Sequence, residues 1–284
     1  MENIAFDYTY PMAINFKRVG RPVKSWDDEL VENARYIKSK TDKPIIVALS
    51  GGIDGEIVCR SFLKAGIDFT VLTIRHTNGT NKHDIVYAEN FCKKFGVKQV
   101  IIEVDPFSLF GNDNIEKHIS QGYVANNVFR YLQLFLLKTI EEMGGCAVLG
   151  AGNQLYENTN DVVTLKYTED FLLSLEWIKN NNTLHFPYFF QTTPEIIAAY
   201  LNHELIKVLT ADPKYYRCPE HHGFSPEKVI IYHSMYPDME RRRKFSGFEN
   251  IIKFRIEQQQ MLSKKFPQTT LHIPISDIKS QIGI

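Results

Sequence analysis

A serine, two glycines and an aspartate directly follow a run of aliphatic residues near position 50. The stretch reads ALSGGIDGE over residues 48–56, after the aliphatic run PIIV. Glycines let backbone N–H groups turn inwards and approach a ligand closely, and a helix N-terminus beside them completes an anion site. An aspartate at the rim can hold the magnesium ion that accompanies a polyphosphate. The pattern therefore predicts a phosphate cradle rather than a plain turn, and it differs from the Walker pattern because no GK[ST] is present.

The elements that must position this loop alternate along the chain. Uninterrupted β-branched runs predict buried parallel strands, and apolar residues at a 3.6-residue period between them predict helices. The strands are expected at 45–49, 69–74, 99–104 and 146–150. This alternation indicates right-handed βαβ units, in which ligands bind at the carboxyl ends of the strands. The expected fold class is α/β, a Rossmann-like doubly wound parallel sheet with a mainly helical C-terminal region.

The chain is expected to divide into three parts. Residues 1–42 form an N-terminal extension with an edge strand in FDYTYPMAINF and one helix capped by Ser25. Residues 43–175 form the domain that carries the loop, and residues 176–284 form a helical region that selects the substrate. The pattern turns helical from about residue 169, with helices expected at 169–178, 193–209, 225–235 and 248–266.

Composition excludes several classes of protein. The 284 residues carry 33 basic and 33 acidic side chains, so the net charge of zero gives no electrostatic reason to bind nucleic acid or a membrane surface. No apolar stretch approaches the ~20 residues that span a bilayer, and the N-terminus does not resemble a signal peptide. The four cysteines form no CxxC pair, and buried free thiols are expected. We therefore expect a cytoplasmic protein.

The loop resembles that of a known family. LSGGIDG is similar to the SGGxDS loop of the PP-loop ATP pyrophosphatases, which include asparagine synthetase, NAD synthetase, GMP synthetase, argininosuccinate synthetase and the tRNA sulfurtransferases. The resemblance implies an adenine nucleotide alpha-hydrolase-like fold and an enzyme that uses ATP and Mg²⁺, cleaving ATP between the α and β phosphates. It places the pyrophosphate on Ser50, Gly51, Gly52, Asp54 and Gly55, with Asp54 as magnesium ligand and catalytic group. The adenine would face Thr73, Ile74 and Arg75.

A second stretch extends the resemblance. LGAGNQLYE, at 149–157, is similar to the LGTGNxxE segment of NAD synthetase, which implies nucleotide contacts from Gly150, Gly152 and Asn153. Lys166, in TLKY, corresponds to a lysine in the TKYGD segment of NAD synthetase after a slightly longer gap. A lysine there would offset charge on the transferring phosphoryl group, and Arg130 is a second candidate for this work. The resemblance covers about residues 44–167.

One position departs from the family pattern. Gly55 stands where the family has its last loop serine, and Glu56 follows it. This change removes a hydroxyl donor and adds a carboxylate, which could serve magnesium or repel phosphate. Backbone donors make most of such a cradle, so an active enzyme is still favoured.

Two further clusters carry chemistry-bearing residues. RCPEHHGF, at 217–224, holds Cys218, His221 and His222, which could bind a metal or simply belong to a folded loop. The run RRRK contains Arg241, Arg243 and Lys244, which could hold an anionic substrate or form a solvated helix face.

Three functions remain open at this point. The first is adenylation of a carbonyl or carboxylate of a small molecule, followed by displacement of AMP by ammonia or an amine. The second is sulfur transfer through the same adenylate, which the absence of a CxxC pair disfavours. The third is a nucleotide-binding sensor without catalysis. The expected partners are a small-molecule substrate, a second copy in a homodimer and a separate nitrogen-donor protein, while nucleic acid and membranes are not expected.

Overall fold

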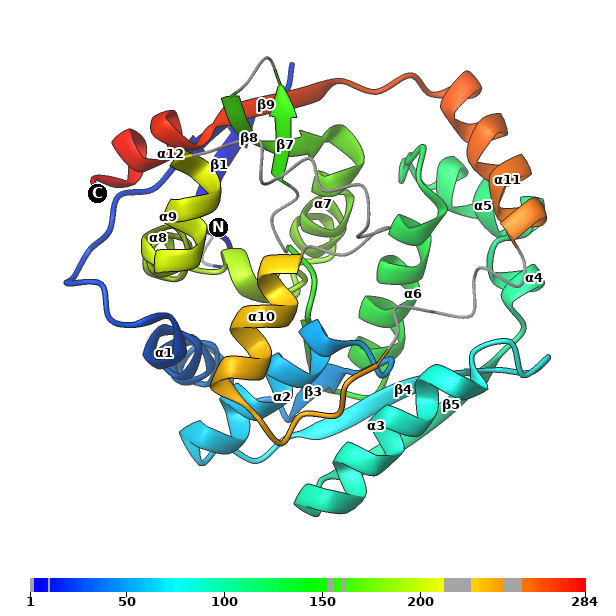
Figure 1. Cartoon of the computed structure of the whole chain (residues 1–284). Helices are drawn as coiled ribbons and strands as arrows, with labels where there is room; N and C mark the ends of the chain where they lie inside the picture. Colours follow the sequence, from blue (N-terminus) through cyan, green and yellow to red (C-terminus); the bar gives the residue numbers. More distant parts are fainter. Residues whose placement is uncertain (1–2, 10, 153–155, 160–161, 212–225, 243–251) are drawn as a thin grey trace.

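The central layer is a four-stranded parallel sheet (Figure 1). The computed structural model describes residues 3–9, 11–152, 156–159, 162–211, 226–242 and 252–284. The strands β3 (Ile45–Ala48), β4 (Thr70–His76), β5 (Lys98–Val104) and β6 (Cys146–Leu149) pair in the order β5-β4-β3-β6, every pair parallel. The expected α/β, Rossmann-like doubly wound fold is thereby confirmed.

Helices cover both faces of this sheet. α2 (Ile53–Ala65) joins β3 to β4, and α3 (Lys82–Phe95) joins β4 to β5. The remaining crossover returns to the other side of β3 and contains α4 (Pro106–Leu109), α5 (Asn112–Ser120) and α6 (Val128–Glu142).

Successive residues of β3 point to opposite faces, as a strand requires. Ile45 and Val47 pack in the same hydrophobic cluster as Phe62 of α2, whereas Ile46 packs in the cluster that contains Leu137 of α6. The strand order reverses between β3 and β6, which makes the carboxyl ends of these two strands the expected ligand site.

The N-terminal segment forms a hairpin rather than one edge strand. β1 (Phe6–Thr9) pairs antiparallel with β2 (Ala13–Phe16), and Pro11 lies in the turn between them, where its missing N–H costs no ladder bond. α1 (Trp26–Ser39) follows, and Oγ of Ser25 accepts a hydrogen bond from N of Asp28 at 3.2 Å, as the capping pattern predicts.

A second, antiparallel sheet was not predicted from the sequence. β7 (Tyr156–Thr159), β8 (Val162–Thr168) and β9 (Thr270–Pro274) pair in the order β7-β8-β9. β9 is short and its partner lies far away in the sequence, so no local hairpin pattern identifies it. The pairing of β8 with β9 joins the part predicted at 43–175 to the part predicted at 176–284. The limits of these parts stay a prediction.

The rest of the chain is mainly helical, as expected. The predicted helix 193–209 is divided into two at His203, whose backbone is extended. The elements are η1 (Glu169–Leu172), α7 (Leu173–Asn180), η2 (Phe189–Gln191), α8 (Pro194–Asn202), α9 (Glu204–Ala211), α10 (Pro226–Met235), α11 (Ile252–Lys265) and α12 (Ile275–Ile282). None of the helices in the described ranges is both long and apolar enough to cross a membrane.

Candidate active site

The glycine loop lies between the carboxyl end of β3 and the first turn of α2, next to the point where the strand order reverses. Gly52 is the N-cap of α2 and has no side chain that could bond the first N–H groups of the helix. Within the loop, Oγ of Ser50 accepts a hydrogen bond from N of Gly52 at 3.3 Å. An uncapped helix N-terminus beside a bare loop is a binding site for an anion such as phosphate.

Gly51 and Gly52 are glycines for different physical reasons. Gly51 has a φ of 111°, and a Cβ there would lie 1.9 Å from the carbonyl oxygen of Asp84 in the first turn of α3. Gly51 is therefore required by packing against α3. A Cβ on Gly52 would have only one neighbour within 4 Å among the described residues, Oγ of Ser50 at 3.5 Å. The open approach to the backbone thus lies at Gly52.

The second glycine stretch packs directly on the first. A Cβ on Gly150 would lie 2.9 Å from N of Gly55, and one on Gly152, with a φ of 81°, would lie 2.7 Å from Cβ of Tyr188. A Cβ on Gly55 would meet Cδ1 of Leu49 at 3.0 Å. Both motifs that carry the family resemblance therefore meet at one place, in contacts that only glycines permit. Asn153 lies outside the described residues.

Asp54 is the carboxylate at this site. Its Oδ1 is buried and has no hydrogen-bond partner among the described residues, while its Oδ2 lies 4.0 Å from Nζ of Lys228. A buried carboxylate oxygen without a partner fits a magnesium ligand, since Mg²⁺ binds oxygen and takes one or two carboxylates beside phosphate oxygens. No group of three or more His, Cys, Asp or Glu side chains that could hold a metal occurs in the described part of the chain.

Lys228 is a site residue that the sequence analysis missed. It lies on α10 and is only 8% exposed. The only local signal was a lysine directly before the apolar residues VII of the helix PEKVIIYHSM. Its position beside Asp54 depends on how α10 packs against α2, which no local pattern states.

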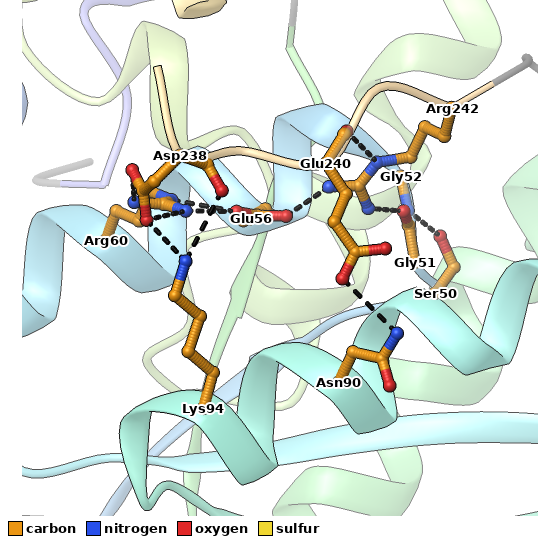
Figure 2. Close-up of polar contacts among 10 residues, drawn as sticks. All are labelled: Ser50, Gly51, Gly52, Glu56, Arg60, Asn90, Lys94, Asp238, Glu240 and Arg242. Carbon is orange, nitrogen blue, oxygen red and sulfur yellow. Dashed lines mark hydrogen bonds and ion pairs between the residues drawn. The ribbon is translucent and has the colours of Figure 1, made fainter. Parts of the chain in front are cut away.

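Glu56 is held by two arginines (Figure 2). Its Oε1 accepts a hydrogen bond from Nε of Arg60 at 2.8 Å, and its Oε2 accepts one from Nη2 of Arg242. Nη1 of Arg242 donates to the carbonyl oxygen of Gly51. Because two guanidinium groups compensate its charge, Glu56 neither presents a free oxygen to magnesium nor opposes phosphate with an uncompensated charge. Both roles considered from the sequence are therefore replaced by an ion-pair role.

The arginine at the loop is Arg242, which belongs to the run RRRK. Arg242 stacks over the ring of Tyr87, with 4.7 Å from its Cζ to the ring centroid. Arg241 is exposed, and Arg243 and Lys244 lie outside the described residues, as do Cys218, His221 and His222. Arg242 and Arg241 also lower the pKa of His233, after burial, which is the largest cause.

The three residues proposed for the adenine lie near the carboxyl end of β4, an inner strand of the parallel sheet. Thr73 is fully buried, and its Oγ1 donates to the carbonyl oxygen of Leu49 at 2.9 Å. The carbonyl oxygen of Ile74 accepts a hydrogen bond from Nδ2 of Asn81 at 3.0 Å. Arg75 forms ion pairs with two exposed carboxylates, at 3.0 Å to Glu89 and 3.6 Å to Glu103. Contact of these three residues with a nucleotide stays a prediction.

Arg130 and Lys166 lie in other surroundings. Nε of Arg130 is 3.5 Å from Oδ1 of Asp170, and its Cζ lies 5.4 Å from the ring centroid of Phe171. Lys166 lies on β8 opposite His272, in the small sheet that Figure 1 shows apart from the parallel sheet. Their catalytic roles stay predictions.

Comparison with known proteins gives a family match for part of the chain. Residues 29–159 match the family model described as NAD synthase. A comparison with curated proteins found no match. Similar solved structures include NMN synthetase from Francisella tularensis, 13% identical over 84% of this chain and 92% of that chain, with a TM-score of 0.35. An NH3-dependent NAD synthetase from Campylobacter jejuni is 15% identical over 87% of this chain and 99% of that chain, with a TM-score of 0.36. A predicted subunit of tRNA methyltransferase from Methanocaldococcus jannaschii is 15% identical over 60% of this chain and 74% of that chain, with a TM-score of 0.36. The match to the NAD synthase model over residues 29–159 supports the resemblance of the glycine loop to that of the PP-loop ATP pyrophosphatases.

Proposed function

We propose that this protein is an ATP-dependent, AMP-forming ligase that activates a small molecule and joins it to ammonia or an amine. The observation that carries the proposal is the SGGxD loop at the switch point of the sheet, with an uncapped helix N-terminus and an unpartnered oxygen on Asp54. The match of this part of the chain to the NAD synthase family supports ATP-dependent adenylation as the class of reaction.

The proposed reaction has two steps. An oxygen of the substrate carboxylate attacks the α-phosphorus of ATP, the bond to the β phosphate breaks, and an acyl adenylate and pyrophosphate form. Ammonia then attacks the acyl carbon, AMP leaves with the electron pair of the C–O bond, and one proton is released. The product is an amide, and a substrate activated at the oxygen of an amide carbonyl would give an amidine by the same sequence.

The residues of the loop would bind the leaving pyrophosphate rather than take part in bond making. The uncapped N–H groups at the start of α2 would bind the anion, and Lys228 adds a buried positive charge. Asp54 would hold magnesium, which supplies neutralisation of charge on the phosphates when it is bound. We propose that residues 176–284 select the molecule to be activated.

Nitrogen is favoured over sulfur by the state of the described cysteines. Cys59, Cys92 and Cys146 are buried, and burial raises the pKa of Cys59 well above its usual value, that of Cys92 to about 11 and that of Cys146 to about 12. A sulfur carrier needs an accessible thiol with a lowered pKa, because the thiolate is the reactive form. Free ammonia, an amine substrate or a separate donor protein would supply the nitrogen.

Exchange of labelled pyrophosphate into ATP tests the proposal. The full chain is incubated with Mg²⁺, ATP, labelled pyrophosphate and a panel of small carboxylic acids and amides. We expect exchange with one class of compound only, and AMP, pyrophosphate and an amidated product in equal amounts once ammonium is added. Formation of ADP and phosphate, or exchange with no compound, would contradict the proposal. Product mass with sulfide in place of ammonium separates amination from thiolation.

A further inference from the structure

A row of alternating charges runs from the surface of α3 to the glycine loop (Figure 2). It begins at Lys94, passes through Asp238, Arg60 and Glu56, and ends at Arg242. Asp238 and Arg242 belong to residues 236–242, which follow α10 and which we name the C-terminal strap. Hydrogen bonds from Lys94 and Arg60 hold the pKa of Asp238 at about 2, so this carboxylate stays charged.

The row is exposed at one end and buried at the other. The side chains of Lys94 and Asp238 are 50% and 48% exposed, whereas those of Glu56 and Arg242 are 5% exposed. Replacement of a buried ion pair by apolar residues is often neutral for stability, so stability alone does not account for charges placed here. Three cations and two carboxylates leave one excess positive charge, and the buried end of the row touches the loop.

The contact with Gly51 bears on the orientation of the loop. A trans peptide is planar, so its carbonyl oxygen and the N–H of the next residue point in opposite directions. Arg242 bonds the carbonyl oxygen of Gly51 on one side of this peptide, and on the other side the N–H of Gly52 donates to Oγ of Ser50 at 3.3 Å, so the two contacts together set its orientation. Peptides flanked by glycines rotate more freely than others because no Cβ restricts them. A contact from outside the loop, such as that of Arg242, therefore helps to hold the Gly51–Gly52 peptide in one orientation.

We propose that Arg242 is a positioning residue of the glycine loop. It holds the Gly51–Gly52 peptide, and with it the entry to the first turn of α2, in the orientation that binds pyrophosphate, and Glu56 holds Arg242 in place. The departure from the family pattern at Glu56 thereby acquires a role: its carboxylate is the anchor of the strap. The inference deepens the proposed function and rests on it.

The test compares two arginine-to-lysine variants of the full chain. Arg242→Lys keeps the charge but cannot bond Gly51 and Glu56 at once, because a lysine is a point charge without the guanidinium fork. The matched control is Arg21→Lys: Arg21 bonds Glu29 at 2.6 and 2.5 Å, and the Glu29 side chain is 1% exposed, away from the loop. Affinity for pyrophosphate with Mg²⁺ and for ATP with Mg²⁺ is measured by calorimetry, and the unfolding midpoint by circular dichroism.

We expect Arg242→Lys to weaken both affinities by about tenfold, the size of one lost hydrogen bond to a charged group. Arg21→Lys should bind both ligands as the wild type does, although its unfolding midpoint falls. Hydrogen exchange of the peptide 49–56 should become faster in Arg242→Lys and stay unchanged in Arg21→Lys. Equal affinity of Arg242→Lys and wild type would overturn the inference.

Two other outcomes are also decisive. If the wild type binds neither ligand, the proposed function itself fails, and this result is distinct from failure of the positioning role. If Arg242→Lys does not fold, Tyr87→Leu replaces it, since this change removes the ring beneath the guanidinium and leaves both acceptors of Arg242 in place. Weaker pyrophosphate binding by Tyr87→Leu would then support the inference, and wild-type affinity would overturn it.

Discussion

Oδ2 of Asp54, in the first turn of α2, lies 4.0 Å from Nζ of Lys228, on α10. The other oxygen of Asp54 is buried and has no hydrogen-bond partner among the described residues. With this pair, the free oxygen of Asp54 can hold a cation while the ammonium of Lys228 attracts a phosphate beside it. The C-terminal part of the chain therefore contributes a charge directly to the glycine loop.

Asp54→Asn should abolish magnesium-dependent turnover and leave the fold intact. The amide keeps the shape of the side chain but loses the charge that a hard cation requires. AMP formation at saturating ATP and the circular dichroism spectrum are the two measurements. Asp113→Asn is the control, because Asp113 is an exposed aspartate in the first turn of α5. Normal turnover by Asp54→Asn would show that this carboxylate does not serve the metal.

Lys228→Met should weaken binding of pyrophosphate with Mg²⁺ by about tenfold. The variant loses a charge-assisted hydrogen bond between the buried ammonium and a phosphate oxygen. Methionine retains an apolar stem of similar length, so the unfolding free energy should change little. Calorimetric titration gives the affinity. Lys264→Met, in the last turn of α11, is the control and should bind as the wild type does. An unchanged affinity in Lys228→Met would remove Lys228 from the phosphate site.

The two loop glycines should respond in opposite ways to alanine. Gly51→Ala should lower the free energy of unfolding by about 2 kcal/mol or more, because a φ of 111° and a clash with the carbonyl of Asp84 strain the folded state. Gly52→Ala should cost less than about 1 kcal/mol, since its Cβ has room, and should still weaken ATP binding by narrowing the approach to the backbone. Urea unfolding and calorimetry separate these effects. Full ATP affinity in Gly52→Ala would place the phosphates elsewhere.

Stability should fall as the pH drops from about 6.5 to about 4, because of two buried histidines. Burial is the largest cause that lowers the pKa of His118 and of His185, each to about 4. Nδ1 of His185 accepts a hydrogen bond from N of Ala147 at 2.9 Å, which requires the neutral ring. Between the folded and unfolded pKa values the unfolded chain binds more protons, so the stability that the neutral histidines contribute is full above pH 6.5 and lost by pH 4.

His118→Gln should flatten this pH dependence by an amount of the order of 2 kcal/mol across the window. Urea unfolding at pH 7, 5.5 and 4.5 measures the slope. His83→Gln is the control, since His83 lies in the first turn of α3 and is only partly buried. A slope in His118→Gln equal to that of the wild type would contradict the assignment.

The sequence by itself determined the parallel strands, the helices between them and the position of the glycine loop. These features have local causes: β-branched runs, a 3.6-residue period, the Ser25 cap, and glycines at the end of β3. The two family motifs could also be recognised locally, and their meeting at Gly55 and Gly150 follows from the adjacency of β3 and β6.

Only the tertiary structure decided which charges reach the loop. Lys228 and Arg242 arrive there because the C-terminal strap and α10 pack on α2, and β9 forms because β8 offers it a free edge. Such contacts join residues far apart in the chain, and their geometry depends on the packing of whole elements rather than on the spacing of neighbouring residues. The same packing explains why Gly51 must be glycine: the obstacle is the carbonyl oxygen of Asp84, on another helix.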